Sequence, residues 1–197
     1  MTKGEKTRHK IVAKAAALFN QYGFWGFSMS ELMKATGLEK GGIYRHFDSK
    51  EQLAAEAFQY AWGEALQTRM YDLHARSNSV EWLKQFVDNF VSRRSSVPGG
   101  CPLLNTAVDA DDGSATLRQL ALRALRGWRR ELIQVVKAGI ARKEIEHGVN
   151  PQEVADVIIS SLEGAVMMSG LEGGRKPLLS IRSYLHSYID RQLRLRA

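Results

Sequence analysis

The chain has 197 residues, of which 44% are hydrophobic and 25% are charged, and this composition excludes extensive disorder. It carries 28 Lys and Arg residues against 21 Asp and Glu residues, and the resulting net charge of +7 favours a polyanionic partner. One cysteine excludes an intrachain disulfide framework, and the lack of a long apolar run or a secretory segment predicts a cytoplasmic protein without a membrane partner.

Three helices are predicted in the N-terminal quarter of the chain, where apolar side chains recur at helical spacing. Their expected bounds are residues 7–22, 29–36 and 40–46. Gly23 and Gly37 follow the first two helices as stop residues, and Ser28 forms with Glu31 a capping box that begins the second helix. Phe47 follows the third helix and is expected in the core.

Six more helices are predicted in the rest of the chain from capping residues, prolines and glycines. They are expected at residues 50–73, from Ser79 to the breaker segment 95–100, at 102–108, from Ser114 through Val135, at 151–170 and at 178–195. Residues 109–113 are expected to form a turn. No segment alternates as a β-strand does, so the fold is predicted to be all-α with about nine helices.

The two short helices on either side of Gly37-Leu38, behind a longer first helix, have the layout of a helix-turn-helix. In that motif the second helix enters the major groove of DNA. The charge agrees, since residues 1–50 hold nine Lys and Arg residues against four Asp and Glu residues. A small helical unit without a DNA-binding role has the same short helices, so the spacing alone leaves that alternative open.

A longer pattern then identifies a family. The run from Gly37 to Leu53, GLEKGGIYRHFDSKEQL, resembles the signature of TetR-family transcriptional regulators, and the upstream pairs Gly23-Phe24 and Ser28-Met29 fit its spacing. The resemblance covers about residues 7–53, and beyond them only the number and lengths of the helices suit the family.

The resemblance implies a helix-turn-helix DNA-binding domain at residues 1–48 and an effector-binding and dimerisation domain at residues 49–197. It further implies a homodimeric regulator, most often a repressor, that a small-molecule effector releases from an inverted-repeat operator. Glu39 and Gly42 depart from the family pattern, which more often has small hydroxyl residues there. No catalytic residue, metal or cofactor is assigned. Two alternatives stay open: a small all-helical enzyme, and a constitutive DNA-binding protein without an effector.

Eight residues are expected to contact DNA, through their match to the family motif or their place on or beside the recognition helix. They are Ser28, Lys40, Gly41, Gly42, Tyr44, Arg45, His46 and Lys50. Tyr44 and Lys50 match a phosphate-contacting tyrosine and lysine of the family. Arg45 is expected to read a base, because a guanidinium bonds guanine with two hydrogen bonds. Tyr44 and His46 have packing against the core as their alternative role.

Residues 151–170 are apolar on nearly every side, which indicates a helix buried against more than one neighbour. A second subunit is expected to cover this helix, in a four-helix bundle formed with residues 178–195 and their two-fold mates. The expected interface residues are Val157, Leu162, Val166, Leu185, Tyr188 and Ile189.

Aromatic and sulfur-containing side chains outside the helix-turn-helix are expected to line an apolar effector pocket, with ordinary core packing as the alternative. The residues assigned to this pocket are Trp62, Phe86, Phe90, Cys101, Trp128 and Met167. The Gly100-Cys101 pair resembles that of family members that sense oxidants or electrophiles. The alternative for Cys101 is a small buried hydrophobe.

Overall fold

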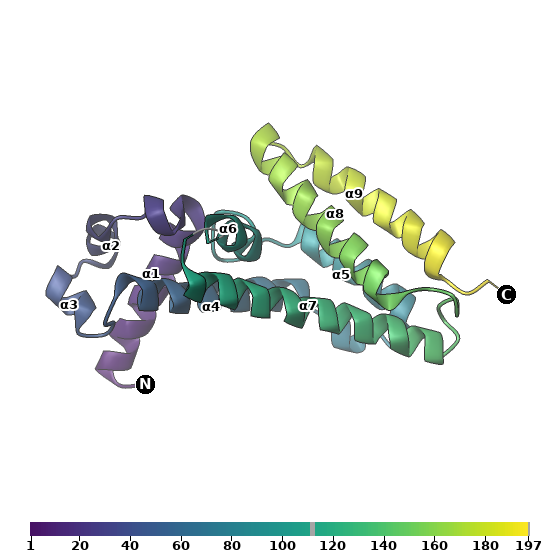
Figure 1. Ribbon diagram of the computed structural model, residues 1–197, viewed down its shortest axis with the longest axis horizontal. Helices are drawn as coiled ribbons and strands as arrows, with labels where there is room; N and C mark the ends of the chain where they lie inside the picture. The colour runs from purple at the N-terminus through teal and green to yellow at the C-terminus, as the bar shows by residue number, and fades with distance from the viewer. Residues whose placement is uncertain (111–112, 197) are drawn as a thin grey trace. The chain divides into compact units, whose positions relative to one another are not determined.

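The computed structural model describes residues 1–110 and 113–196, and its regular structure is helical (Figure 1). The α-helices are α1 (Lys3–Gly26), α2 (Met29–Thr36), α3 (Lys40–Tyr44), α4 (Lys50–Arg69), α5 (Ser79–Ser92), α6 (Pro102–Asp109), α7 (Ala115–Ala141), α8 (Pro151–Glu172) and α9 (Lys176–Tyr188). A 3₁₀ turn, η1 (Leu73–Ala75), and a π-helical turn, η2 (Ile189–Leu193), are also present. Nine α-helices without a strand in these described ranges confirm the predicted all-α fold.

The chain divides into two compact units. Unit 1 consists of residues 1–65 and 95–124, and unit 2 consists of residues 66–94 and 125–197. Helices α4 and α7 each contribute residues to both units. The functional boundary predicted between residues 48 and 49 divides the chain differently and stays a prediction.

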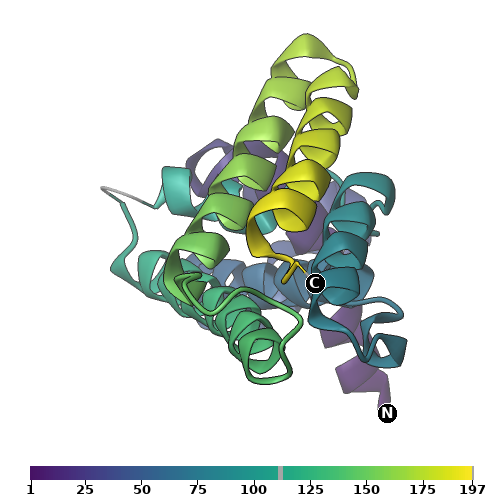
Figure 2. The same ribbon diagram turned by 90° about the vertical axis from the view of Figure 1, so that its right-hand side faces the viewer.

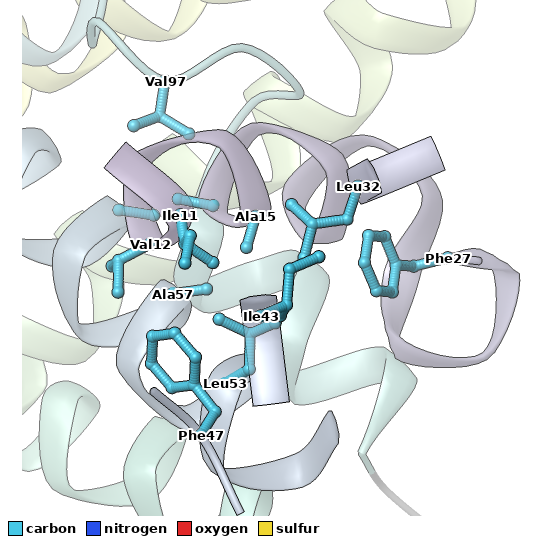
Figure 3. Close-up of a cluster of buried hydrophobic side chains, with 12 residues drawn as sticks. Ile11, Val12, Ala15, Phe27, Leu32, Ile43, Phe47, Leu53, Ala57 and Val97 are labelled. Carbon is cyan, nitrogen blue, oxygen red and sulfur yellow. The ribbon is translucent and has the colours of Figure 1, made fainter. Parts of the chain in front are cut away.

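The core of unit 1 gathers aliphatic and aromatic side chains from α1, α2, α3 and the first turns of α4 (Figure 3). Ile11, Leu32, Ile43 and Phe47 are among its most deeply buried members, and Val97 adds a side chain from the segment before α6. Burial of this shared apolar surface holds α3 against α1 and α2. The expectation that Phe47 is a core residue is confirmed.

Helix α1 begins at Lys3, earlier than the predicted residue 7, because Thr2 and Glu5 form a capping box that apolar spacing does not reveal. Gly23 interrupts α1 as predicted, with a φ of 75°, but helical residues resume after it and α1 ends at Gly26. Both predicted ends of α2 are confirmed, with a capping box at its start and a left-handed glycine after its last residue.

Helix α3 ends at Tyr44, earlier than predicted, because the backbone N–H of His46 donates to the Ile43 carbonyl, 3.0 Å away, in a tighter turn. Helix α4 ends at Arg69, before the predicted Leu73, which instead begins η1. Part of the turn predicted at residues 109–113 lies outside the described residues.

In unit 2, α8 and α9 lie side by side, and α5 packs against α9 (Figure 2). Asn78, rather than the predicted Ser79, caps α5 by accepting hydrogen bonds from two backbone N–H groups. Helix α9 does not continue to residue 195 as predicted. Its axis ends at Tyr188, and the chain then makes η2 and an isolated β-bridge between Arg194 and Ile145.

Candidate DNA-binding interface

The solvent side of α3 combines basic and aromatic groups. Ile43 is the buried residue of this short helix, whereas Lys40, Gly41, Tyr44 and the adjoining Arg45 are exposed. Tyr44 is 39% exposed, so the alternative of a core position does not hold. The Lys40 ammonium lies 5.9 Å from the centroid of the Tyr44 ring. This surface offers hydrogen-bond donors to phosphates and to base edges.

The two glycines of α3 differ in their surroundings. A Cβ atom at Gly41 would meet nothing within 4 Å, so the backbone is open to close approach there. A Cβ atom at Gly42 would lie 3.8 Å from the Leu38 side chain, and this glycine is half-buried. His46 is also half-buried, with its ring centroid 6.4 Å from that of Phe47. DNA contacts by Gly42 and His46 stay predictions.

The hydroxyl group of Ser28 is already used at the N-terminus of α2. It accepts from the Glu31 backbone N–H, 3.3 Å away, and donates to the Glu31 carboxylate, 2.7 Å away. The hydrogen bonds from Ser28 lower the pKa of Glu31, so this carboxylate is ionised at neutral pH. A phosphate bound at this helix end would therefore meet a negative charge as well as backbone N–H groups.

The side chain of Lys50 turns toward the segment that joins α1 and α2. Its ammonium donates to the Phe27 carbonyl, 2.9 Å away, and lies over the rings of Phe24 and Phe27, at 4.7 and 5.4 Å from their centroids. Burial lowers the pKa of Lys50, while the charge of Asp109 opposes this effect. Lys50 thus fastens the start of α4 to the helix-turn-helix, and its predicted phosphate contact stays a prediction.

Two other basic residues near this surface make contacts between helices. Arg8 pairs with Glu56, with 2.6 Å between nitrogen and oxygen, and Lys10 donates to the Thr36 carbonyl at 2.8 Å. These two side chains join α1 to α4 and to the end of α2. Lys34, by contrast, lies exposed on α2 and was not among the predicted DNA contacts. A basic residue on the polar side of the helix before the turn is the pattern that could have identified it.

The segment before α6 is bound to α1 through two asparagines. The Asn20 side chain donates to the Pro98 and Gly100 carbonyls at 2.7 and 3.3 Å, and Asn105 of α6 donates to the Asn20 carbonyl at 2.9 Å. Gly99, at a φ of 106°, allows this approach, because a Cβ atom there would lie 2.5 Å from the Asn20 oxygen. This contact makes α6 part of the support behind the helix-turn-helix.

The residues assigned to an effector pocket are distributed over both units. Unit 1 holds Trp62 and Cys101, and unit 2 holds Phe86, Phe90, Trp128 and Met167. A partly open cavity in unit 1, among α1, α4, α6 and the start of α7, has a volume of about 30 Å³, which suits a single water molecule. None of these residues lines it. Met167 is 53% exposed on α8. For all six residues the pocket stays a prediction.

Three of the predicted dimer contacts were wrong. Leu162, Leu185 and Ile189 are each 0% exposed inside unit 2, because they occupy the apolar side of α8 and of α9–η2 that faces the protomer's own core. Val157, Val166 and Tyr188 are half-buried and stay predicted contacts. Five apolar residues that were not among the predicted contacts are well exposed on α8 and α9, namely Met167, Met168, Leu171, Leu179 and Tyr184.

Two segments of the chain match the same protein family. Residues 11–57 match "Bacterial regulatory proteins, tetR family", and residues 79–185 match "Tetracyclin repressor-like, C-terminal domain". The chain is 26% identical over 172 residues to the HTH-type transcriptional repressor DhaR of Mycobacterium sp. strain GP1, with 87% of this chain and 86% of DhaR covered.

Two solved structures of TetR-family regulators have a similar fold. A TetR transcriptional regulator from Chloroflexus aurantiacus J-10-FL is 42% identical, with full coverage of both chains and a TM-score of 0.95. The regulator CifR, as a cysteine mutant complexed with 26-base-pair operator DNA, is 21% identical, with 91% of this chain and 94% of CifR covered and a TM-score of 0.79. At 21% identity the likeness to CifR concerns the fold alone.

Proposed function

The chain belongs to the TetR family of bacterial transcriptional regulators, and we propose that it is a homodimeric repressor of the cytoplasm that a small-molecule effector releases from an inverted-repeat operator. Residues 1–48 are the DNA-binding domain in this proposal, and residues 49–197 bind the effector and form the dimer. Family membership favours this function over a small helical enzyme.

The observation that carries the proposal is the exposed surface of α3. Lys40, Tyr44 and Arg45 are exposed on a helix that Ile43 anchors in the core. This part of the chain also holds most of the excess positive charge, since residues 1–50 carry +5 of the net +7. A rigidly held helix with guanidinium, ammonium and phenol groups on its outer side suits both phosphate binding and base reading.

Dimerisation through α8 and α9 has independent support in their exposed apolar residues. Leu171 is 82% exposed, and Met167, Met168 and Tyr184 lie exposed on the same pair of helices. Among the described helices, α8 is the one that is long and apolar enough to span a membrane by length and composition. A second copy of the chain covers such a surface in the proposed dimer, and two recognition helices then suit an inverted repeat.

Effector release requires that the effector bind a dimer geometry unsuited to the operator more tightly than the DNA-bound geometry. Helix α4 is the proposed connection, because its first residue, Lys50, holds the segment between α1 and α2, while its last residue, Arg69, belongs to unit 2. A shift of this helix along or about its axis changes the support of the helix-turn-helix.

Selection of bound sequences from random DNA duplexes tests the proposal. The expected result is an inverted-repeat consensus whose affinity falls steeply as salt rises through about 0.1 M. Protein binding releases cations from the DNA, and a higher salt concentration makes this release less favourable. The double variant Lys40→Ala/Arg45→Ala should lose binding, whereas Lys137→Ala/Lys176→Ala, which removes the same charge from exposed sites in unit 2, should keep it. Recovery of no consensus by the native chain would count against sequence-specific regulation.

A further inference from the structure

Unit 2 contains a buried guanidinium among aromatic rings. Arg69, at the end of α4, is 7% exposed, and its guanidinium carbon lies 4.4 Å from the ring centroid of Phe90 on α5 and 4.9 Å from that of Trp128 on α7. The two rings are nearly parallel, at 11°, with centroids 5.9 Å apart. Glu163 of α8 faces the same guanidinium, with 4.0 Å between Nη2 and Oε1, and is 9% exposed. We call these four residues the Arg69 site.

Stabilisation of the fold alone does not explain such a group of side chains. Transfer of two charges from water to a protein interior costs several kcal/mol per ion, and apolar residues of similar volume are often as stable as a buried ion pair. Two aromatic faces and a carboxylate are, however, the arrangement with which proteins bind organic cations. Unit 2 therefore has a cation-binding site that its own Arg69 occupies.

We propose that the effector is an organic monocation with a flat or aromatic body, which takes the place of the Arg69 guanidinium between Glu163 and the two rings. This inference rests on the proposed function, since it specifies the class of the effector. The exchange keeps the charge balance, because one cation leaves the carboxylate as another arrives. An anion that paired with Arg69 would instead leave Glu163 buried beside a second negative charge, at a high electrostatic cost.

Arg69 lies close to the surface, so its displaced side chain can reach solvent. Its displacement also changes how the end of α4 is held. Arg69 is the last residue of α4, and the chain reaches the surface at Tyr71, two residues later. Asn89 of α5 donates to the carbonyls of Arg69 and Tyr71 at 3.0 and 2.7 Å, so the end of α4 is held by both its backbone and its guanidinium. Loss of the guanidinium contact loosens one of these two attachments of α4, the helix that begins at Lys50.

The test uses the full-length protein without DNA and three probes of the same shape: the benzamidinium cation, neutral benzamide and the benzoate anion. Calorimetric titration and thermal unfolding should show that the native protein binds benzamidinium at least about 10-fold more tightly than the other two, as expected for a charge-assisted contact. The variant Arg69→Met, which removes the internal competitor, should bind benzamidinium at least about 10-fold more tightly than the native protein does. In Arg69→Met/Glu163→Gln, the matched neutral pair, benzamidinium and benzamide should bind alike.

Three results would overturn the proposal. Equal binding of all three probes by the native protein would indicate an apolar pocket, and preferred binding of benzoate would indicate an anion site at Arg69. Unchanged benzamidinium affinity in a folded Arg69→Met variant would place the cation elsewhere. If that variant does not fold, the ranking of the three probes on the native protein decides alone. Because DNA is absent, these outcomes are independent of whether duplex selection returns an operator.

Discussion

The Asp109 carboxylate, at the end of α6, accepts a hydrogen bond from the backbone N–H of Phe24, with 2.6 Å between the two atoms. Phe24 follows Gly23, the residue at which α1 is interrupted, and a Cβ atom on Gly23 would lie 2.9 Å from the same carboxylate. The Asp109 charge also favours the ammonium form of Lys50. One side chain of α6 thus supports the interruption of α1 and the start of α4.

Removal of this acceptor should weaken unit 1. We expect Asp109→Ala to lower the free energy of unfolding by about 1–3 kcal/mol, because the Phe24 N–H is left without its partner in a partly buried position. Asp109→Asn keeps an acceptor oxygen and should cost less. Urea denaturation of the two variants and the native protein measures the difference. Equal stability of all three proteins would mean that water replaces the carboxylate at no cost.

Base reading and phosphate binding should separate at two neighbouring positions of α3. Arg45→Ala is expected to cost about 1–3 kcal/mol of operator binding and to relax the preference at one position in each half-site. Tyr44→Phe removes only a hydroxyl group and should weaken binding to all duplexes by a similar factor, about 2- to 10-fold. Titration against a panel of single-base operator variants distinguishes the two effects. An unchanged base preference in Arg45→Ala would assign this residue to phosphate.

The exposed apolar residues of α8 should hold the dimer together. The double variant Met167→Glu/Leu171→Glu is expected to be folded but monomeric, because both side chains are exposed in the single chain and carboxylates oppose their burial against a second copy. Sedimentation measures the mass, and operator binding should fall with dimerisation. The matched control is Val108→Glu, an exposed apolar position of unit 1, which should stay dimeric. If Met167→Glu/Leu171→Glu remained dimeric, the interface would lie on another surface.

The stability of unit 2 should fall in acid through Asp190. This carboxylate bonds to Lys84 of α5 at 2.8 Å and to Arg194 at 3.1 Å, and these hydrogen bonds hold its pKa below the ordinary value. Since the pKa is lower in the folded than in the unfolded protein, the stabilisation is present above about pH 4 and is lost as the pH falls through the folded-state pKa. Asp190→Asn should therefore be less stable than the native protein by about 0.2–1 kcal/mol at pH 7, because partly exposed ion pairs contribute little. The difference should shrink toward pH 3. A difference independent of pH would contradict this role.

Local chemistry made the helix-turn-helix predictable, whereas long-range packing did not follow from it. The capping box at Ser28 and the left-handed Gly37 act within a few residues, so the sequence alone places both ends of α2. The bond from Phe24 to Asp109 joins residues far apart in the chain and has no such local pattern. Likewise, the apolar residues of α8 are visible in the sequence, but the packing of α8 against other helices of unit 2, which the sequence does not show, leaves Leu162 buried and Leu171 exposed.

Cys101 should behave as a packing residue. It is the N-cap of α6 and is 2% exposed. Of the two glycines before it, Gly100 accepts a hydrogen bond from Asn20 of α1, and Gly99 accepts one from Asn105 of α6. Burial keeps reagents away from the thiol. We therefore expect slow reaction with N-ethylmaleimide and with peroxide at neutral pH in the folded protein, fast reaction in urea, and no loss of operator affinity over the time of the assay. Cys101→Ser should bind the operator as the native protein does, because serine is a favoured N-cap residue. Rapid alkylation that releases DNA from the native protein but not from Cys101→Ser would instead establish the cysteine as a sensor, acting through the Gly99-Gly100 contact with α1.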